Sequence, residues 1–387
     1  MNTINITNKK IGIIGGGQLG KMMVLEAKRL GFYVAVLDPG ADCPASSIVD
    51  EHIVAGFGEP QGYFELAKKV DVITYEFEHI NAAALEILEK EGHLIYPSVT
   101  SLKTIQNKFL QNQVLEQHGI PVPRFELVSN TDEIRALGEP AAFGYPIMLK
   151  ATTGGYDGKG NALVRGEADI ESAYASLGGA ANEIMAEEFV DFKMEISVIA
   201  CRGIDGAQVI YPVGENIHMN SILDTTIVPA RIGQTEVDKA RAIANRVMEV
   251  FEGVGTFCIE LFVGKNGEIY VNEVAPRPHN SGHYTIEGCF ANQFENHVRA
   301  ITGLPFGCVE LIEPTVMVNL LGQSDGAARL EGLHKAYQDN RVNVHFYGKN
   351  ESKKDRKMGH FTVVGADLDS AVERAEKIKG IVRVTGS

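Results

Sequence analysis

The segment KATTGGYDGKGN, residues 150–161, decides how the centre of this chain is to be understood. It follows the apolar run PIML, which is typical of a buried strand, and it combines four glycines with an aspartate and two lysines. Such a loop is suited to phosphate. It is not a Walker A loop, because Gly158 and Lys159 are followed by Gly160 and not by Ser or Thr. The segment therefore predicts a strand that ends in a different kind of phosphate-binding loop.

A second glycine segment, IGIIGGGQLG at residues 11–20, matches a dinucleotide-binding fingerprint through Gly15, Gly17 and Gly20. Asp38 ends the next predicted strand, where a ribose-binding acid would lie. The physical content of this pattern is narrower, since glycines and a helix N-terminus suit any phosphorylated ligand. Three interpretations remain open here: an NAD(P) site, another phosphate site, or a tight turn needed only for packing.

The first hundred residues alternate between strand and helix patterns, which predicts βαβ units and a parallel sheet. The predicted strands are 10–15, 33–38, 71–78 and 93–98, and the predicted helices are 18–31, 62–70 and 81–92. Gly31 is expected to end the first helix.

The centre of the chain begins with a helical region at 98–119 and continues mainly as strands. The predicted strands here are 145–151, 162–166, 183–190, 193–202 and 207–218, followed by an amphipathic helix at 236–253 and a hairpin over 255–277 that turns at GKNGE. The remainder is expected to be β-rich, with strands at 315–322, 342–349, 359–365 and 381–386 and a helix at 369–380.

Bulk composition limits the functional classes. A chain of 387 residues predicts two or three domains, and its net charge of −14 argues against a general nucleic-acid or anionic-membrane surface. The five cysteines form no C-x-x-C pair, so we interpret them as isolated buried thiols. No apolar run approaches the ~18 residues of a membrane span and the N-terminus lacks a signal-peptide core, so a cytoplasmic location is expected.

Charged residues within apolar strands predict an active site in the centre of the chain. Lys150 must pair or reach an anion, because its strand is otherwise apolar, and Lys108 is a second candidate for phosphate. The hairpin is expected to bring Glu260 and Glu273 side by side, and with Asn272 they would form an oxygen-rich site suited to Mg²⁺.

The residues after this hairpin suggest an anion site more strongly than a zinc site. Arg277, four residues beyond Glu273, is suited to a small planar anion such as carboxylate or bicarbonate. His279 and His283 have a spacing that binds zinc on a helix. A regular helix is disfavoured here, because Pro278 and Gly282 interrupt it and no Glu follows His279.

In the order of these parts the chain resembles the ATP-grasp enzymes, and more closely the N5-carboxyaminoimidazole ribonucleotide synthetases of purine biosynthesis. The segments that carry the resemblance are GGGQLG (15–20), YEFEHI (75–80), GGYDGKGN (154–161), NEVAPRPHNSGHYT (272–285) and YGKNESKKDRKMGH (347–360). The resemblance implies a mixed α/β and α+β fold of three domains. They are a βαβ pre-ATP-grasp domain (1–105), an ATP-grasp domain (106–310) with a mobile lid near 152–161, and a small β-rich domain (311–387) that completes the substrate site.

The resemblance also implies roles for individual residues. ATP would be bound by Lys108, Lys150, Gly155, Gly158, Lys159, Gly160, Asn161, Glu187, Glu188, Phe189, Val190, Glu195, His218, Asn272 and Glu273. The ribonucleotide would be bound by Gly17, Gln18, Leu19, Glu76, Tyr156, Asp157, Lys349 and Arg356. Glu260 and Glu273 would hold Mg²⁺ or Mn²⁺, and the catalytic groups would be Asp157, Tyr156, Arg277 and Lys349.

The reaction implied is ATP-dependent phosphorylation of bicarbonate to carboxyphosphate, which yields CO₂ beside the amine of 5-aminoimidazole ribonucleotide. The amine then forms the carbamate, and ADP and phosphate leave. Asp157 either orients the amine or accepts its proton. Biotin carboxylases have Glu-x-Asn-x-Arg at the bicarbonate site. This chain keeps the spacing of Glu273 and Arg277, but it has Ala275 in place of the Asn.

Other functions share parts of this pattern. A dehydrogenase would bind nicotinamide at residues 15–20, and a nucleotide-binding regulator would have no need of paired metal-binding acids. A different ATP-grasp ligase would share the central domain but would not need the segment 347–360. The partners expected are small molecules, namely ATP, bicarbonate and the ribonucleotide, with neither nucleic acid nor membrane. The resemblance implies a homodimer.

Overall fold

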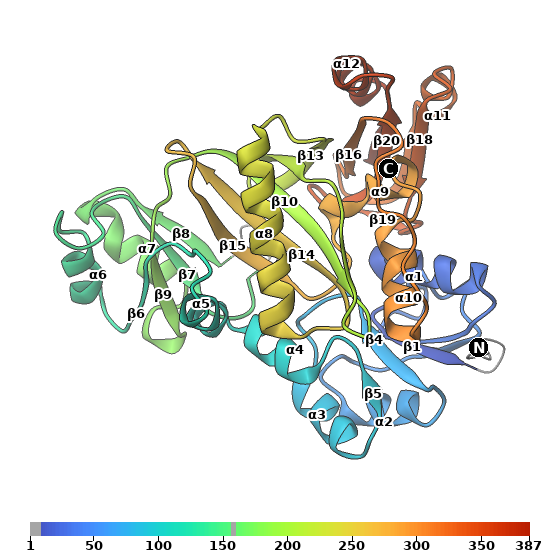
Figure 1. Ribbon diagram of the computed structural model, residues 1–387, viewed down its shortest axis with the longest axis horizontal. Coiled ribbons are helices and arrows are strands. Elements are labelled where there is room, and N and C mark those ends of the chain that lie inside the picture. Colours follow the sequence, from blue (N-terminus) through green and yellow to red (C-terminus); the bar gives the residue numbers. More distant parts are fainter. Residues whose placement is uncertain (1–8, 156–159) are drawn as a thin grey trace.

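The computed structural model describes residues 9–155 and 160–387 (Figure 1). Four residues of the predicted lid, Tyr156, Asp157, Gly158 and Lys159, lie outside the described residues.

Within those two ranges, no helix combines the length and apolar character that crossing a bilayer requires.

The N-terminal part forms the predicted parallel sheet, in the order β3-β2-β1-β4-β5. Its elements are β1 (Lys10–Ile14), α1 (Gln18–Arg29), β2 (Tyr33–Leu37), β3 (Glu51–Ile53), α2 (Pro60–Ala67), β4 (Val72–Tyr75), α3 (Ala82–Lys90), β5 (Leu94–Ile95) and α4 (Val99–Gln106). The sequence did not indicate β3, which is only three residues long. The strand predicted over 93–98 shrinks to β5, because Pro97 has no N–H to donate and Ser98 caps α4 by accepting from Ser101.

Helix α1 sits between the sheet and the rest of the molecule. Its buried residues include Leu19, Met23 and Ala27, which recur at helical spacing, and α1 packs against α10 (Gln293–Thr302). Gly31 has φ of +80° and ends the helix as predicted. The beginning of α1 is thereby placed at the carboxyl end of β1 and next to the end of β4.

The helical region predicted over 98–119 is broken at Asn107. This residue ends α4 and caps α5 (Lys108–Gln117), because its side chain accepts from the N–H of Leu110 at 3.0 Å. The break places Lys108 on the first turn of a new helix.

Two sheets build the centre of the molecule. A four-stranded sheet in the order β6-β9-β7-β8 stands at one side, and α8 lies across the larger central sheet (Figure 1). The elements are β6 (Phe125–Val128), α6 (Thr131–Leu137), β7 (Ile147–Ala151), β8 (Asn161–Val164), α7 (Ile170–Ser176), β9 (Ile184–Glu188), β10 (Phe192–Arg202), β11 (Gln208–Ile210), β12 (Gly214–Met219), β13 (Ile222–Val228), α8 (Gln234–Phe251), β14 (Gly255–Gly264), β15 (Ile269–Ala275), α9 (Thr285–Gly288) and α10. The predicted hairpin is β14 and β15, and the strand predicted over 207–218 is split into β11 and β12 around Pro212.

The C-terminal strands continue the central sheet. Along the path β15-β14-β10-β12-β13-β16-β20-β18, strand β13 pairs with β16, so one nine-stranded sheet, which includes β11, runs from the centre into the C-terminal part. The remaining elements are β16 (Thr315–Leu321), β17 (Gly326–Glu331), α11 (Leu333–Ala336), β18 (Val342–Phe346), β19 (Glu351–Ser352), β20 (Lys357–Val364), α12 (Leu368–Lys379) and β21 (Arg383–Gly386). The sequence indicated β16, β18, β20, β21 and α12 but missed the half-exposed β17 and the two-residue β19.

Candidate active site

A cleft of about 580 Å³ opens where the three parts of the chain meet. Sixteen of the predicted site residues line it: Gln18, Leu19, Glu76, Lys150, Gly155, Asn161, Glu187, Glu188, Phe189, Val190, Glu195, His218, Glu260, Asn272, Glu273 and Arg277. The sequence analysis assigned no role to others that line it, among them Phe77, Glu78, Met148, Phe192, Ser221, Leu223, Phe262, Asn280 and Lys357. Most of these are apolar or sit in loops, so they carry no pattern of their own.

Lys150 is buried and paired, as its apolar strand requires. Its ammonium forms an ion pair with Glu187 on β9 and donates to the Asn272 side chain at 3.2 Å. Asn112 donates to the same Glu187 carboxylate at 3.1 Å. We expected Glu187 to act mainly through its backbone, whereas its side chain is the ion-pair partner of Lys150 inside the protein.

Lys108 faces the hairpin from the first turn of α5. Its ammonium lies 2.8 Å from a carboxylate oxygen of Glu273. Burial disfavours the charge on Lys108, but Glu273 and further carboxylates outweigh it, and the pKa of Lys108 is raised. Two lysines from different elements thus contact adjacent residues of β15, Asn272 and Glu273, although Lys108 itself is not among the residues that line the cleft.

Glu260 and Glu273 are directly opposite each other in the β14–β15 register, as predicted. Burial, and then the neighbouring Glu273, raise the pKa of Glu260 to about 7. Two adjacent carboxylates with the Asn272 amide nearby are hard oxygen donors with excess negative charge, which is the donor set that suits Mg²⁺.

Glu195 and His218 lie together on the neighbouring strands β10 and β12. The His218 Nδ1 is 3.2 Å from a Glu195 oxygen. Burial lowers the pKa of His218, but Glu195 outweighs this effect and the net shift is upward. Both side chains face the cleft, beside the apolar rings of Phe192 and Phe262, which are stacked 4.7 Å apart.

Arg277 is held by Glu78, a residue that the sequence analysis did not single out. The two side chains form a two-pronged ion pair with N–O distances of 2.6 and 3.1 Å. Burial opposes the negative charge of Glu78, yet Arg277 overcomes it and lowers the pKa of Glu78 to about 2. The available signal was the i, i+2 spacing of Glu76 and Glu78 at the end of β4, which predicts a shared face.

The glycine turn at residues 15–20 is closed by protein carboxylates. Glu76 accepts from the N–H groups of Gly17 and Gly20, each at 2.5 Å, and Asp38 accepts from Gly16 at 2.8 Å. A Cβ on Gly20 would lie 2.3 Å from the Gly15 carbonyl oxygen, so this glycine is required by packing. The dinucleotide interpretation of this turn is therefore wrong, because Glu76 occupies N–H groups that a pyrophosphate would use.

The basic segment after β18 lies against α1. Lys349 donates to the backbone carbonyl of Lys357 at 2.7 Å, and Lys21 of α1 donates to that of Tyr347 at 3.1 Å. Arg356 is exposed and donates to the Glu351 carbonyl at 3.0 Å. Lys357 itself lines the cleft, whereas Lys349 and Arg356 stand behind it.

His279 and His283 do not share a site. The His279 Nε2 lies 3.6 Å from Glu260, while the His283 ring packs against His360 with centroids 4.6 Å apart. The expectation of buried thiols holds for four cysteines and is wrong for Cys308, which is exposed.

Comparison with known proteins now adds to this geometry. Three family profiles match in chain order: the ribonucleotide synthetase preATP-grasp domain over residues 8–106, the ATP-grasp domain over 113–294, and the phosphoribosylaminoimidazole carboxylase C-terminal domain over 315–374. The N5-carboxyaminoimidazole ribonucleotide synthase of Staphylococcus aureus (strain COL) is 40% identical over 362 residues, which cover 93% of this chain and 93% of that protein. The chain belongs to the N5-carboxyaminoimidazole ribonucleotide synthase family.

Solved structures of this synthase family have the same fold. The Thermotoga maritima synthetase superposes with a TM-score of 0.90 at 47% identity, covering 98% of this chain and 100% of that one. The synthase of Aspergillus clavatus, solved with ADP and 5-aminoimidazole ribonucleotide, superposes with a TM-score of 0.88 at 35% identity, covering 97% of this chain and 98% of that one.

Proposed function

We propose that this chain is an ATP-dependent ligase that carboxylates the amine of 5-aminoimidazole ribonucleotide to give N5-carboxyaminoimidazole ribonucleotide, with release of ADP and phosphate. The observation that carries the proposal is a single cleft in a member of this family. In it, the buried Lys150–Glu187 pair and the carboxylate pair Glu260 and Glu273, which Lys108 contacts, share one lining with the start of α1 and with Lys357 from the C-terminal part.

ATP binds along the wall formed by β7, β9, β10 and β14. The adenine contacts the backbone of residues 187–190 and the ribose hydroxyls meet Glu195 beside His218. When ATP binds, its phosphates replace Glu187 as the ion-pair partner of Lys150 and Glu273 as the ion-pair partner of Lys108. When bound, Mg²⁺ neutralises charge on the transferring phosphoryl group, and Glu260 and Glu273 would hold it.

The ribonucleotide binds between α1 and the C-terminal segment. Gln18 and Leu19 line the cleft at the start of α1, while Glu76 holds the preceding turn in shape through Gly17 and Gly20. Lys21 contacts the segment that carries Lys349 and Arg356, and these basic residues are proposed to supply positive charge for the 5′-phosphate.

Bicarbonate is phosphorylated between these two sites. The Arg277 guanidinium, anchored by Glu78, stands beside the carboxylate pair and can bind a small oxyanion through its remaining N–H groups. Carboxyphosphate is short-lived in water, so the predicted lid over residues 152–161 closes to protect it. Gly155 and Asn161, which both belong to that segment, line the cleft. Tyr156 and Asp157 are proposed to meet the substrate amine.

The deciding experiment measures ADP release from MgATP and bicarbonate with and without 5-aminoimidazole ribonucleotide. Release that depends on the ribonucleotide supports the proposal. ADP release that does not depend on the ribonucleotide would contradict the substrate assignment and would favour a different ATP-grasp ligase.

Lys349→Ala separates those two ligase functions further. It is expected to raise the KM for the ribonucleotide and to leave the KM for ATP unchanged, because its ammonium lies in the segment that contacts α1. An equal change in both constants would contradict the phosphate role. A homodimer in the cytoplasm belongs to the same proposal, and light scattering tests the dimer.

A further inference from the structure

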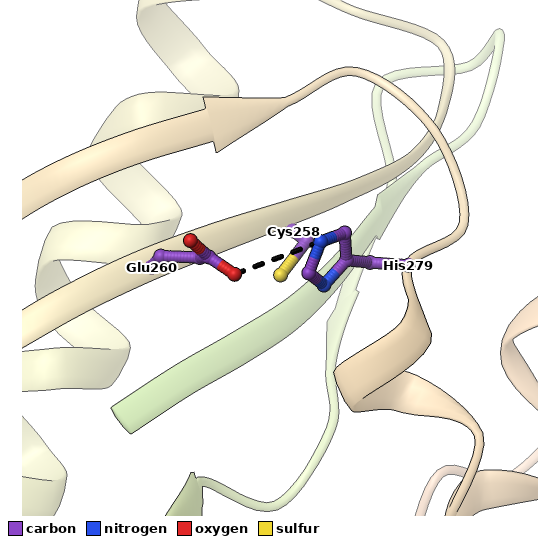
Figure 2. Close-up of side chains that lie close together, drawn as sticks. All are labelled: Cys258, Glu260 and His279. Carbon is purple, nitrogen blue, oxygen red and sulfur yellow. Dashed lines mark ion pairs between the residues drawn. The ribbon is translucent and has the colours of Figure 1, made fainter. Parts of the chain in front are cut away.

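Three side chains with different donor atoms converge beside the carboxylate pair. Cys258 and Glu260 are two residues apart on β14 and therefore point to the same face of the sheet, and His279 follows β15. Figure 2 shows the Glu260 carboxylate, the Cys258 sulfur and the His279 ring directed toward one another. One donor atom from each of the three lies within 4.8 Å of the other two.

The ring of His279 is held in place through its Nδ1. This nitrogen lies 3.0 Å from the Ser281 hydroxyl and accepts from the Ser281 backbone N–H at 3.4 Å, and the hydroxyl accepts from Ser197 at 2.9 Å. The Nε2 nitrogen faces Glu260, at 3.6 Å. Metal binding at Nε2 places the ring proton on Nδ1, which then donates to the Ser281 hydroxyl, the kind of partner that supports a metal-binding histidine.

We propose that Cys258, Glu260 and His279 form a binding site for a thiophilic divalent ion such as Zn²⁺. Sulfur, imidazole nitrogen and carboxylate oxygen are together the donors of tetrahedral zinc, whereas Mg²⁺ takes oxygen donors. Binding replaces the S–H bond by an S–metal bond, and the thiol proton leaves to solvent. Glu260 and His279 line the cleft, which gives an ion its path of entry to the buried Cys258 sulfur.

The site shares Glu260 with the proposed Mg²⁺ site but not its other ligands. Glu260 has Glu273 opposite it in the hairpin and His279 on its other side. One carboxylate cannot serve both ions in full, so a thiophilic ion at this site competes with Mg²⁺. This consequence, unlike the binding itself, rests on the proposed function.

Titration of the full chain with Co²⁺ in the absence of nucleotide tests the binding directly. We expect a sulfur-to-cobalt charge-transfer band and intense visible bands of tetrahedral cobalt, both displaced by Zn²⁺. Cys258→Ser is expected to remove the charge-transfer band and weaken Co²⁺ binding by at least about 100-fold, since even supporting residues alter affinity by 10–100-fold. Cys201→Ser is the matched control, because Cys201 is equally buried but contacts Thr256 and not the cleft.

The proposal is overturned if the wild-type chain shows no charge-transfer band, if the band survives in Cys258→Ser, or if a folded Cys201→Ser loses it. Circular dichroism establishes folding. Should Cys258→Ser not fold, His279→Gln takes its place, and it is expected to weaken Co²⁺ binding by a similar factor while keeping a thiolate band at high cobalt.

A second measurement follows ADP release at fixed MgATP while Zn²⁺ is added. Wild type is expected to be inhibited, and inhibition should be relieved by excess Mg²⁺ and be at least about tenfold weaker in Cys258→Ser. Equal inhibition of both proteins would contradict competition between Zn²⁺ and Mg²⁺ at this site. A chain that binds Co²⁺ through Cys258 but releases no ADP would keep the metal site and reject the proposed function.

Discussion

Two regions of the same cleft shift the pKa of a largely buried glutamate in opposite directions. At the end of β4, Glu78 is held by Arg277, and its pKa is lowered to about 2 because this pairing outweighs the effect of burial. In the β14–β15 hairpin, burial and then Glu273 raise the pKa of Glu260 to about 7. The negative charge of Glu78 is therefore compensated within the protein, whereas that of Glu260 is not.

The difference separates a structural anchor from a ligand site. A buried charge with a two-pronged partner is satisfied and resists change, so Glu78 and Arg277 join the first domain to the end of β15. A cation bound between two facing carboxylates relieves their mutual repulsion, so the hairpin is suited to bind one.

The largest expected effect comes from Arg277→Met. It leaves Glu78 buried without its counter-charge, and we expect the free energy of unfolding to fall by about 3–5 kcal/mol. Urea unfolding measures the change. Adding Glu78→Gln should recover much of the loss.

The matched control is Lys265→Met, which breaks an ion pair with Asp191 whose side chains are 64% and 72% exposed. Exposed pairs contribute less than about 1 kcal/mol. If both substitutions have equal effects, the anchoring role of Arg277 is lost.

Glu260→Gln is expected to stabilise the chain without metal. Because the folded-state pKa is raised from 4.5 to about 7, the folded chain binds more protons than the unfolded chain between these values, and stability falls as pH rises through the window. The substitution removes this penalty, so it should add up to about 3 kcal/mol above pH 7 and almost nothing near the lower end.

Unfolding in urea with a chelator, at about pH 5 and about pH 8, checks the sign. Glu273→Gln serves as the opposite case, because it leaves Lys108 without the carboxylate at 2.8 Å and should destabilise the chain. A stabilising effect of Glu260→Gln that is the same at both pH values would contradict the assigned cause.

Glu76→Gln probes a third case, a buried carboxylate whose pKa is raised by burial and is only partly brought back by two backbone N–H groups. The amide offers one acceptor oxygen, so the N–H of either Gly17 or Gly20 would face an NH₂ group, and we expect a loss of about 2 kcal/mol. Thermal unfolding measures it, with the half-exposed Glu65→Gln on α2 as a near-neutral control. An unchanged midpoint would mean that the turn does not depend on Glu76.

The smallest effect is a pH dependence of Mg²⁺ binding. A proton on Glu260, whose pKa is about 7, competes with the cation, so apparent Mg²⁺ affinity should fall about tenfold between about pH 8 and pH 6. Mg²⁺ titration of ADP release at saturating ATP measures it. A flat profile would place the cation on other ligands.

Local patterns predicted most elements of the fold. The alternation of strands and helices predicted the parallel first sheet, and the turn at GKNGE predicted the hairpin and hence the opposition of Glu260 and Glu273, because a hairpin register follows from its turn. The elements that were missed include short or half-exposed strands such as β3, β17 and β19, whose residues carry too little apolar periodicity, and the short helices α6 and α7.

Local sequence patterns could not predict which partners the charged residues contact. Glu78 reaches Arg277 across 199 positions, and Lys150 meets Asn272 across 122. The glycine turn stayed open to three interpretations for a related reason. Its fingerprint describes N–H donors and says nothing of the carboxylate of Glu76, which lies 56 positions further along the chain.

By itself, the sequence indicated most of the longer strands and helices and the residues that carry charge into apolar surroundings, because these depend on periodicity over a few neighbours. The tertiary structure alone decided that β13 and β16 join two regions into one sheet, and which carboxylate meets arginine, lysine, backbone or another carboxylate. The physical reason is that burial and charge compensation depend on contacts between distant segments, and folding brings those segments together only when the whole chain packs.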